Sequence, residues 1–225
     1  MNIWGFRCVQ CHQPLQIGAH GLCSRCYREI RRFAYCGKCG SELAQNTLHC
    51  GRCLRDEPSW DRLVMVGRYN EPLSTLIHRF KFQNQFWLDR TLARLLLLAV
   101  QNAKREHGLI LPDVILPVPL HHFRQWGRGY NQADLLAHWL AKWLQRPVDN
   151  GLLSRNKRTP TQRGLTANAR RRNLKKAFSL RKPLVYQRVA LVDDVITTGS
   201  TLNEVAKLLR QHGAQEIQVW GLART

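Results

Sequence analysis

The chain has 225 residues, of which 35 are Lys or Arg and 15 are Asp or Glu, so its formal net charge at pH 7 is +20. This length accommodates one α/β domain of about 168 residues beside a smaller unit of about 57 residues. The densest apolar run, residues 95–100, is far shorter than the roughly 18 residues that a membrane span needs. We therefore expect a soluble, cytoplasmic protein without a membrane span.

Eight cysteines lie in the first quarter of the chain and form four C-x-x-C pairs. Two thiolates separated by two residues can face one ion, and two such pairs complete the four-sulfur shell that structural Zn²⁺ prefers. An offset of 28 residues superimposes the first pair on the third, and an offset of 27 superimposes the second on the fourth. A duplicated unit should bind its own metal, which predicts two consecutive zinc ribbons. The predicted ligands are Cys8, Cys11, Cys23 and Cys26 in one site, and Cys36, Cys39, Cys50 and Cys53 in the other.

Other arrangements of these cysteines remain open. In a cross-braced arrangement, pairs from different repeats would share an ion. Disulfides are the second alternative, but residues 1–7 hold no apolar run long enough for a secretory signal. Redox chemistry at one C-x-x-C pair is the third, although four pairs in a duplicated unit favour structural metal. We expect the two ribbons to form a domain of residues 1–57 whose folding depends on metal binding.

A polar, proline-bearing stretch at residues 56–59 marks the boundary to a second domain, residues 58–225. Its helix-like and strand-like patterns alternate, which predicts an α/β fold with a mostly parallel sheet and helices on both faces. Such sheets bind ligands at the carboxyl ends of their strands. We expect strands at residues 62–69, 114–118, 189–192 and 216–222, and helices at residues 72–81, 88–103, 131–144 and 200–209.

Residues 189–204, V-A-L-V-D-D-V-I-T-T-G-S-T-L-N-E, carry the most informative motif. An apolar strand leads into two carboxylates, Asp193 and Asp194, and then into a short loop before a helix. The first N–H groups of that helix lack internal partners and favour an anion. The loop should therefore bind a phosphate, while the carboxylates accept hydrogen bonds from ribose hydroxyls or hold Mg²⁺. The loop residues are Thr197, Thr198, Gly199, Ser200 and Thr201.

This motif resembles the signature of the type I phosphoribosyltransferases, in which apolar residues precede D/E-D-x-x-T-T-G-x-T. The resemblance implies a domain of that fold in which Asp193 and Asp194 bind the ribose hydroxyls of phosphoribosyl pyrophosphate (PRPP). It also implies that residues 197–201 bind the 5-phosphate and that Mg²⁺ accompanies PRPP. The alternative is a strand, a turn and a capped helix that bind no ligand.

Residues 114–130 form a second candidate loop, because an apolar strand ends there in prolines followed by cationic side chains. Prolines stiffen a loop and shape a site, whereas the cations would bind the charge. If Asp193 and Asp194 hold the ribose, the pyrophosphate of PRPP would lie against this loop. A solvated basic turn beside a core strand is the alternative. The candidate pyrophosphate residues are Pro119, His121, Arg124 and Arg128.

Three further segments resemble the ComF/GntX family. They are residues 117–132, residues 158–178, and residues 69–82 with Lys81 and Phe82. A zinc ribbon joined to a phosphoribosyltransferase domain completes the match, so the resemblance covers essentially the whole chain. It implies a role in taking up DNA, either in natural transformation or as a nutrient, and contact with proteins of the uptake machinery.

Residues 154–188 contain twelve Lys and Arg and no Asp or Glu, which indicates a local cationic surface. Such a surface could close over pyrophosphate, bind a DNA backbone, or be a solvated face. Aromatic rings among basic residues could stack on unpaired bases, and we expect Trp126 and Tyr130 to be exposed for this. The candidate residues for single-stranded DNA are Arg163, Arg170, Arg171, Arg172, Lys175, Lys176, Trp126 and Tyr130.

Two functions are compatible with these features. In the first, the protein binds PRPP or a related ribose 5-phosphate together with DNA and supports DNA utilization. In the second, it is an active phosphoribosyltransferase of nucleotide salvage. The second requires an acceptor pocket, and no residue in the sequence identifies a base.

Overall fold

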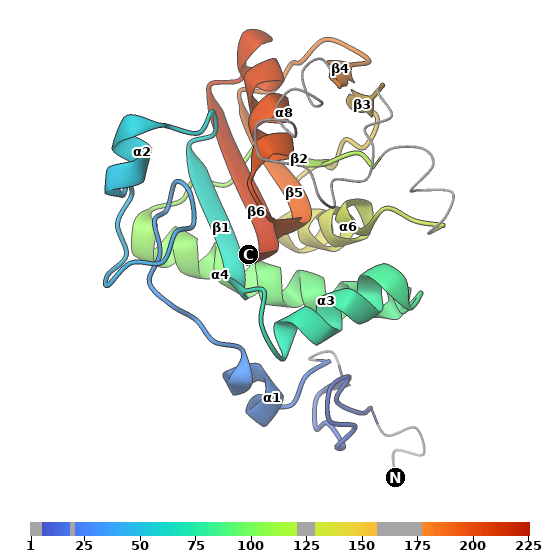
Figure 1. Cartoon of the computed structure of the whole chain (residues 1–225). Coiled ribbons are helices and arrows are strands. Elements are labelled where there is room, and N and C mark those ends of the chain that lie inside the picture. Colours follow the sequence, from blue (N-terminus) through green and yellow to red (C-terminus); the bar gives the residue numbers. More distant parts are fainter. Residues whose placement is uncertain (1–5, 19–20, 121–128, 157–176) are drawn as a thin grey trace.

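The computed structural model describes residues 6–18, 21–120, 129–156 and 177–225. Its centre is a four-stranded sheet in the order β1-β6-β5-β2, in which all neighbouring strands are parallel (Figure 1). The parallel sheet predicted from the sequence is therefore confirmed. Its strands are β1 (Arg62–Arg68), β2 (Val114–Pro117), β5 (Arg188–Ile196) and β6 (Glu216–Arg224).

Strand β5 lies between β2 and β6, and its residues 189–192 are fully buried. An unbroken apolar run suits a parallel strand that is covered on both faces. The expected end of this strand at Val192 is wrong. Pairing with β6 continues through Asp193 opposite Gly221 to Ile196 opposite Arg224. The two carboxylates therefore lie on the last part of the strand and not in the loop after it.

Helices cover both faces of the sheet, as predicted. Alternate residues of β5 point to different cores, with Ala190 and Val192 in one and Val189 and Leu191 in the other. The first core is closed by α3 (Leu73–Phe82), α4 (Asp89–His107) and α6 (Gln132–Leu144), and the short helix η2 (Phe86–Leu88) connects α3 to α4. The second core is closed by α8 (Ser200–Gln211) and by an antiparallel pair, β3 (Leu153–Arg155) and β4 (Phe178–Leu180).

Helix α4 ends at His107 and not at Ala103, where the apolar spacing stops. Its last turn is exposed and basic, which suits the negative end of a helix. Gly108 then stops the helix in a left-handed conformation, with φ of 62°. Even this helix of 19 residues does not span a bilayer, since no helix in the described ranges combines the length and apolarity that crossing a membrane requires.

The two cysteine-bearing units lie on different parts of the domain (Figure 1). Helix α1 (Ser24–Glu29) of the first unit lies beneath α3, and α2 (Gly51–Arg55) of the second lies beside β1. The first unit shares the core of α3 and α4, because Cys8, Leu22, Cys26 and Ile30 belong to that buried cluster. The second unit has a small cluster of its own and joins the sheet through the N–H of Leu63, which donates to the carbonyl of Gly37 at 2.7 Å.

Candidate functional site

A cavity of about 210 Å³ opens at the carboxyl edge of the sheet, where β2 and β5 end. Parallel sheets bind ligands at this edge. Four segments that are distant in sequence line the cavity: the end of α3, the segment after β2, strand β3 and the β5–α8 connection. The structure thus brings together Pro119, the acidic pair of Asp193 and Asp194, and the hydroxyl loop of residues 197–201, as predicted. It adds Lys81 and Arg155 to the lining.

The hydroxyl loop bends sharply at Gly199, which precedes α8 with φ of 73°. A left-handed conformation suits glycine, and the ring of Trp60 packs so closely that a Cβ at Gly199 would lie 2.8 Å from it. The Thr198 and Ser200 hydroxyl oxygens are 2.8 Å apart, so they form one polar rim. The N–H of Ser200 donates to Thr198 Oγ1 at 3.3 Å. Gly199 has no side chain that could cap α8, so the N–H groups of the next two residues can donate to an anion.

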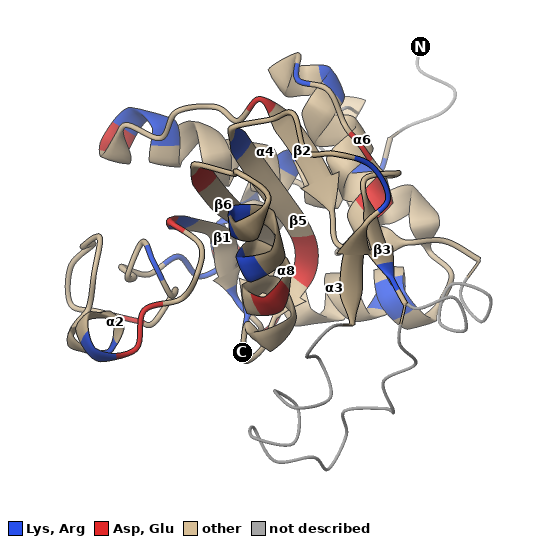
Figure 2. Ribbon diagram, turned by 90° about the horizontal axis from the view of Figure 1, so that it is seen from above, with Lys and Arg blue, Asp and Glu red and all other residues tan. Residues whose placement is uncertain are grey.

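The carboxylates at the end of β5 are held by backbone N–H groups. The N–H of Asp194 donates to Asp193 Oδ1 at 2.9 Å, and the N–H of Val195 donates to Asp194 Oδ1 at 2.6 Å. Burial raises the pKa of Asp193 to about 7, and the neighbouring charge of Asp194 acts in the same direction. Figure 2 shows this acidic band on β5 beside α8. The acidic pair can therefore accept hydrogen bonds or a cation, and its charge changes near neutral pH.

Lys81 from α3 is the cationic partner of this pair. Its Nζ lies 2.8 Å from Asp194 Oδ1, and only 16% of its side chain is exposed. Removing one partner of a buried ion pair strongly destabilises the fold, because the remaining charge is left desolvated and unpaired. Sequence reasoning assigned Lys81 no role at the site. The one indication in the sequence was that Lys81 lies in residues 69–82, which resemble the ComF/GntX family. No local pattern predicts that α3 lies beside β5.

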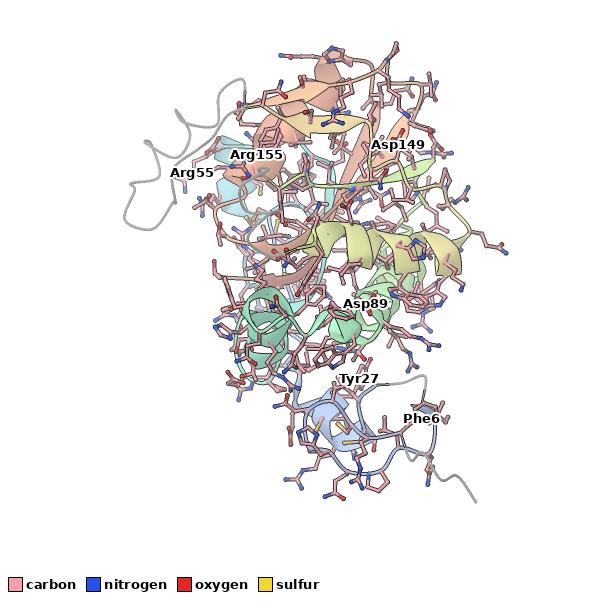
Figure 3. All side chains as sticks on the ribbon, turned by 90° about the vertical axis from the view of Figure 1, so that its right-hand side faces the viewer. Phe6, Tyr27, Arg55, Asp89, Asp149 and Arg155 are labelled. Carbon is pink, nitrogen blue, oxygen red and sulfur yellow. The ribbon has the colours of Figure 1, made fainter. Side chains whose placement is uncertain are left out.

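Arg155 is a second lining residue that sequence reasoning did not single out. It ends strand β3, is almost fully buried, and holds its guanidinium 5.4 Å from the centre of the Phe178 ring. Figure 3 labels Arg155 in the upper part of the view. Arg155 is one of twelve cationic residues between positions 154 and 188, and no local pattern separates it from the rest.

Several predicted residues lie outside the described ranges. These are the pyrophosphate candidates His121, Arg124 and Arg128, and the DNA candidates Trp126, Arg163, Arg170, Arg171, Arg172, Lys175 and Lys176.

The expected exposure of Tyr130 is wrong. Its ring is partly buried against the core that contains Phe80, with ring centres 5.9 Å apart, and its hydroxyl donates to the carbonyl oxygen of Phe80. Tyr130 directly precedes the residue that caps α6, so its side chain points back toward α3. The neighbouring arginines and glycines in the sequence suggested a solvated loop, but they do not report this contact.

The cysteines form two tetrads in sequential order, and the cross-braced alternative is excluded by their positions. Within each tetrad the four Sγ atoms lie within 4.8 Å of one another. The Sγ atoms of Cys11 and Cys23 are 3.6 Å apart, as are those of Cys39 and Cys50. Tetrahedral Zn²⁺ with Zn–S bonds of about 2.3 Å requires sulfur atoms about 3.8 Å apart. The residues therefore fit a four-thiolate metal, and these distances are too long for disulfides.

A cation is needed to keep all four thiols of a tetrad ionised. Burial raises the pKa of the Cys26 thiol in the first tetrad and of the Cys53 thiol in the second, and neighbouring sulfur atoms add to the effect. A bound metal ion would reverse this shift, because a coordinating thiol is deprotonated.

The second tetrad is connected to the hydroxyl loop through Trp60. The indole N–H of Trp60 donates to the carbonyl of Lys38, inside the C-x-x-C pair of Cys36 and Cys39, at 2.6 Å. The same ring packs on Gly199. One aromatic side chain thus contacts both the second cysteine tetrad and the hydroxyl loop.

Relatives of known name match the chain over nearly its whole length. Competence protein F of Haemophilus influenzae is 63% identical over 100% of this chain and 99% of its own. The chain belongs to the ComF/GntX family. DNA utilization protein YhgH of Escherichia coli K12 is 47% identical over 97% of this chain and 96% of its own. Competence protein ComFC of Bacillus subtilis is 26% identical over 92% of this chain and 78% of its own.

The phosphoribosyl transferase domain family matches residues 151–224 of this ComF/GntX protein. That segment contains β5, the hydroxyl loop, α8 and β6. Among solved structures, the adenine phosphoribosyltransferase of Leishmania donovani is 17% identical, covering 73% of this chain and 72% of that chain, with a TM-score of 0.37. The family match thus agrees with the parallel sheet and its helices in assigning a type I phosphoribosyltransferase-like fold.

Elemental analysis of the purified ComF/GntX protein should give two Zn per chain. Cys23→Ser removes a half-buried ligand of the first tetrad and Cys50→Ser its counterpart in the second, so each variant should retain one Zn. A parent protein with a single Zn, or a variant that keeps both, would contradict two independent tetrads.

Gly199→Ala should destabilise the fold by about 2–4 kcal/mol, because it adds a clash with Trp60 to the strain of a left-handed alanine. Gly108→Ala is the matched control: φ is 62° there and a Cβ would meet nothing within 4 Å, so its cost should be about 1–2 kcal/mol. Urea unfolding measures both. A double-mutant cycle with Trp60→Leu should show coupling for Gly199→Ala, and additivity there would disprove the contact.

Proposed function

We propose that this protein is a ComF-like DNA utilization or uptake protein that binds PRPP, or a related ribose 5-phosphate, together with single-stranded DNA. It would support use of extracellular DNA as a nutrient or in natural transformation. The observation that carries the ligand assignment is one cavity lined by an acidic pair, a helix N-terminus with four hydroxyls, and two basic side chains. The names of the relatives in Haemophilus influenzae and Escherichia coli support the biological role.

In this proposal, each wall of the cavity binds one part of the ligand. The N–H groups at the start of α8 and the hydroxyls of residues 197–201 bind the 5-phosphate. Asp193 and Asp194 accept hydrogen bonds from the ribose hydroxyls. Arg155 and Lys81 line the same cavity, so their charges would favour the pyrophosphate. His121, Arg124 and Arg128, beyond Pro119, would extend this cationic wall.

Mg²⁺ fits the same arrangement. Carboxylate oxygens and phosphate oxygens are its preferred ligands, and Asp193 and Asp194 supply the first kind. When bound with PRPP, the ion would offset the negative charge of the pyrophosphate. Lys81 is placed to hold Asp194 in position whether or not the ion is present.

An active phosphoribosyltransferase of nucleotide salvage is the less favoured function. The relatives are named for competence and DNA utilization and not for salvage of a base. A pyrophosphate-release assay with single-stranded DNA and with free bases separates the two functions. Release that depends on a free base would establish the transferase.

The organisation of the chain belongs to the same proposal. Two structural Zn²⁺ ions would occupy the tetrads of residues 1–57, ahead of the ligand-binding domain of residues 58–225. The protein would act in the cytoplasm, where thiols stay reduced, and the exposed faces of the zinc ribbons could contact proteins of the DNA-uptake machinery.

Asp193→Asn with Asp194→Asn should abolish or weaken PRPP binding by at least ten-fold in calorimetry with Mg²⁺, because neutral amides accept fewer charge-assisted hydrogen bonds. Glu106→Gln, on the exposed end of α4, is the control and should bind as the parent does. Unchanged affinity in the double variant would refute the assignment.

The affinity of the parent for ribose 5-phosphate should also increase with pH through about 7, because Asp193 is protonated below that pH and ionised above it. Calorimetry between pH 6 and 8 checks the sign. The phosphate of the ligand contributes a part of this pH dependence that should remain in the Asp193→Asn variant. The part that comes from Asp193 should be lost. An identical pH profile in parent and variant would show that Asp193 does not titrate at the site.

Neutralising Arg170, Arg171 and Arg172 with glutamine should reduce the log-log salt slope for single-stranded DNA by about 2, since each phosphate contact on a single strand contributes about 0.7. The control neutralises Arg55, Lys104 and Arg105, which are exposed elsewhere, and changes the net charge equally. Binding measured by anisotropy from 50 to 300 mM salt distinguishes the variants. Equal slopes in both variants would exclude a local DNA site at residues 170–172.

A further inference from the structure

Exposed aromatic rings gather between α3 and α4. Phe86 and Trp87 are each 57% exposed, and Phe82, four residues earlier, is 54% exposed. Among the large hydrophobic side chains that are exposed in the described part of the chain, only Phe6 is another aromatic. Phenylalanine and tryptophan contribute much of the burial in protein cores, so three outward rings within six positions need an explanation.

The backbone holds these rings outward by a specific turn. Asn84 takes a left-handed conformation with φ of 51°, and Gln85 Oε1 accepts a hydrogen bond from Arg79 Nε at 2.8 Å. The following helix η2 buries Leu88 completely. Because the core is filled by Leu88, its neighbours Phe86 and Trp87 lie on the solvent side, with their rings edge to face at 5.6 Å. The exposure of Phe86 and Trp87 is therefore fixed by the turn before them and by the buried Leu88 after them.

A second set of rings on α6 is half-buried, because it packs against the first core. Trp139 and Trp143 stack at 5.3 Å, with 28° between their planes. The Arg90 guanidinium and the Lys142 Nζ each lie 5.4 Å from the Trp139 ring centre. Asp89 and Arg90 directly follow η2 in the chain and both contact Trp139, so the two sets are neighbours. We call Phe86, Trp87, Trp139 and Trp143, with Arg90 and Lys142, the aromatic surface.

The charge around the aromatic surface is positive. Residues 78–94 and 130–146 contain six Lys and Arg against two Asp. One of the acids, Asp89, accepts a hydrogen bond from the Trp139 indole N–H at 2.9 Å and lies beside α6 (Figure 3). Burial raises the pKa of the other, Asp134, which disfavours its charge. Lys81 is one of the six cations and pairs with Asp194. The surface thus combines aromatic rings with an excess of cations.

This combination selects one class of partner. Unpaired nucleobases offer faces that stack on aromatic rings and cations, while their phosphates pair with Arg and Lys. A duplex hides the base faces. A hydrophobic protein segment would gain little from cations placed over the rings.

We propose that the aromatic surface is a stacking platform for the unpaired bases of single-stranded DNA, a site that rests on the DNA-binding role proposed above. It adds base stacking to the phosphate contacts assigned to the basic segment. The platform connects to the ribose-phosphate cavity through α3, because η2 contacts α3 and Lys81 of α3 pairs with Asp194. It also connects through Tyr130, whose ring lies 6.4 Å from that of Phe86.

The test compares an oligothymidine with an abasic oligomer of equal length and charge, by fluorescence anisotropy. The parent should prefer the oligothymidine. Phe86→Leu with Trp87→Leu should weaken oligothymidine binding about five-fold or more per ring, leave abasic binding unchanged, and leave the salt slope unchanged. Leucine keeps apolar bulk at two exposed positions, and thermal unfolding confirms that the variant folds. Phe6→Leu, an exposed ring on the first cysteine unit, is the matched control and should bind as the parent does.

The outcomes separate this site from the wider DNA-binding proposal. If the parent binds oligothymidine and the double leucine variant binds it equally well, the platform is refuted while DNA binding stands. If the parent binds duplex as tightly as single strand, or binds the abasic oligomer equally well, base stacking is refuted. If the parent binds no DNA, both proposals fail, and PRPP calorimetry then decides the ligand site by itself.

Discussion

Two adjacent carboxylates at the end of a buried parallel strand impose the central constraint on this molecule. A desolvated negative charge is costly, and a second one beside it is more so. The fold offsets this cost with backbone N–H groups from Asp194 and Val195 and with Lys81 from a helix more than a hundred residues earlier in the chain. The position of α3 against the sheet is therefore linked to the charge state of the cavity.

Each cysteine tetrad packs against an element that lines that cavity. The first tetrad packs on the core of α3, and Arg79 Nη1 of α3 donates to the carbonyl of Val9 at 2.8 Å, so it supports the helix that carries Lys81. The second tetrad reaches the hydroxyl loop through Trp60. A metal ion at either tetrad would thus stabilise ligand-binding groups that it does not contact.

Local patterns in the sequence were sufficient for the four-stranded sheet, the four helices that cover it and the sequential pairing of the cysteines. Apolar runs identified buried strands such as residues 189–192, and C-x-x-C spacing identified the two groups of four cysteines. What local patterns missed depends on contacts between distant segments. The extension of β5 through Asp193 depends on pairing with β6, the role of Lys81 on the docking of α3, and the burial of Tyr130 on Phe80. Helix α4 is longer than its apolar spacing predicts, because its last turn lies beyond the core.

The shared core between the first cysteine unit and α3 limits how this chain can be divided. Cys8, Leu22, Cys26 and Ile30 cover apolar side chains of α3 and α4 that would otherwise face water. A truncation that begins at β1 would strip this cover and leave an aggregation-prone face on an otherwise intact sheet. The first cysteine unit therefore completes the core of the second domain, and exchanging this unit between homologues would require matching apolar side chains on α3 and α4.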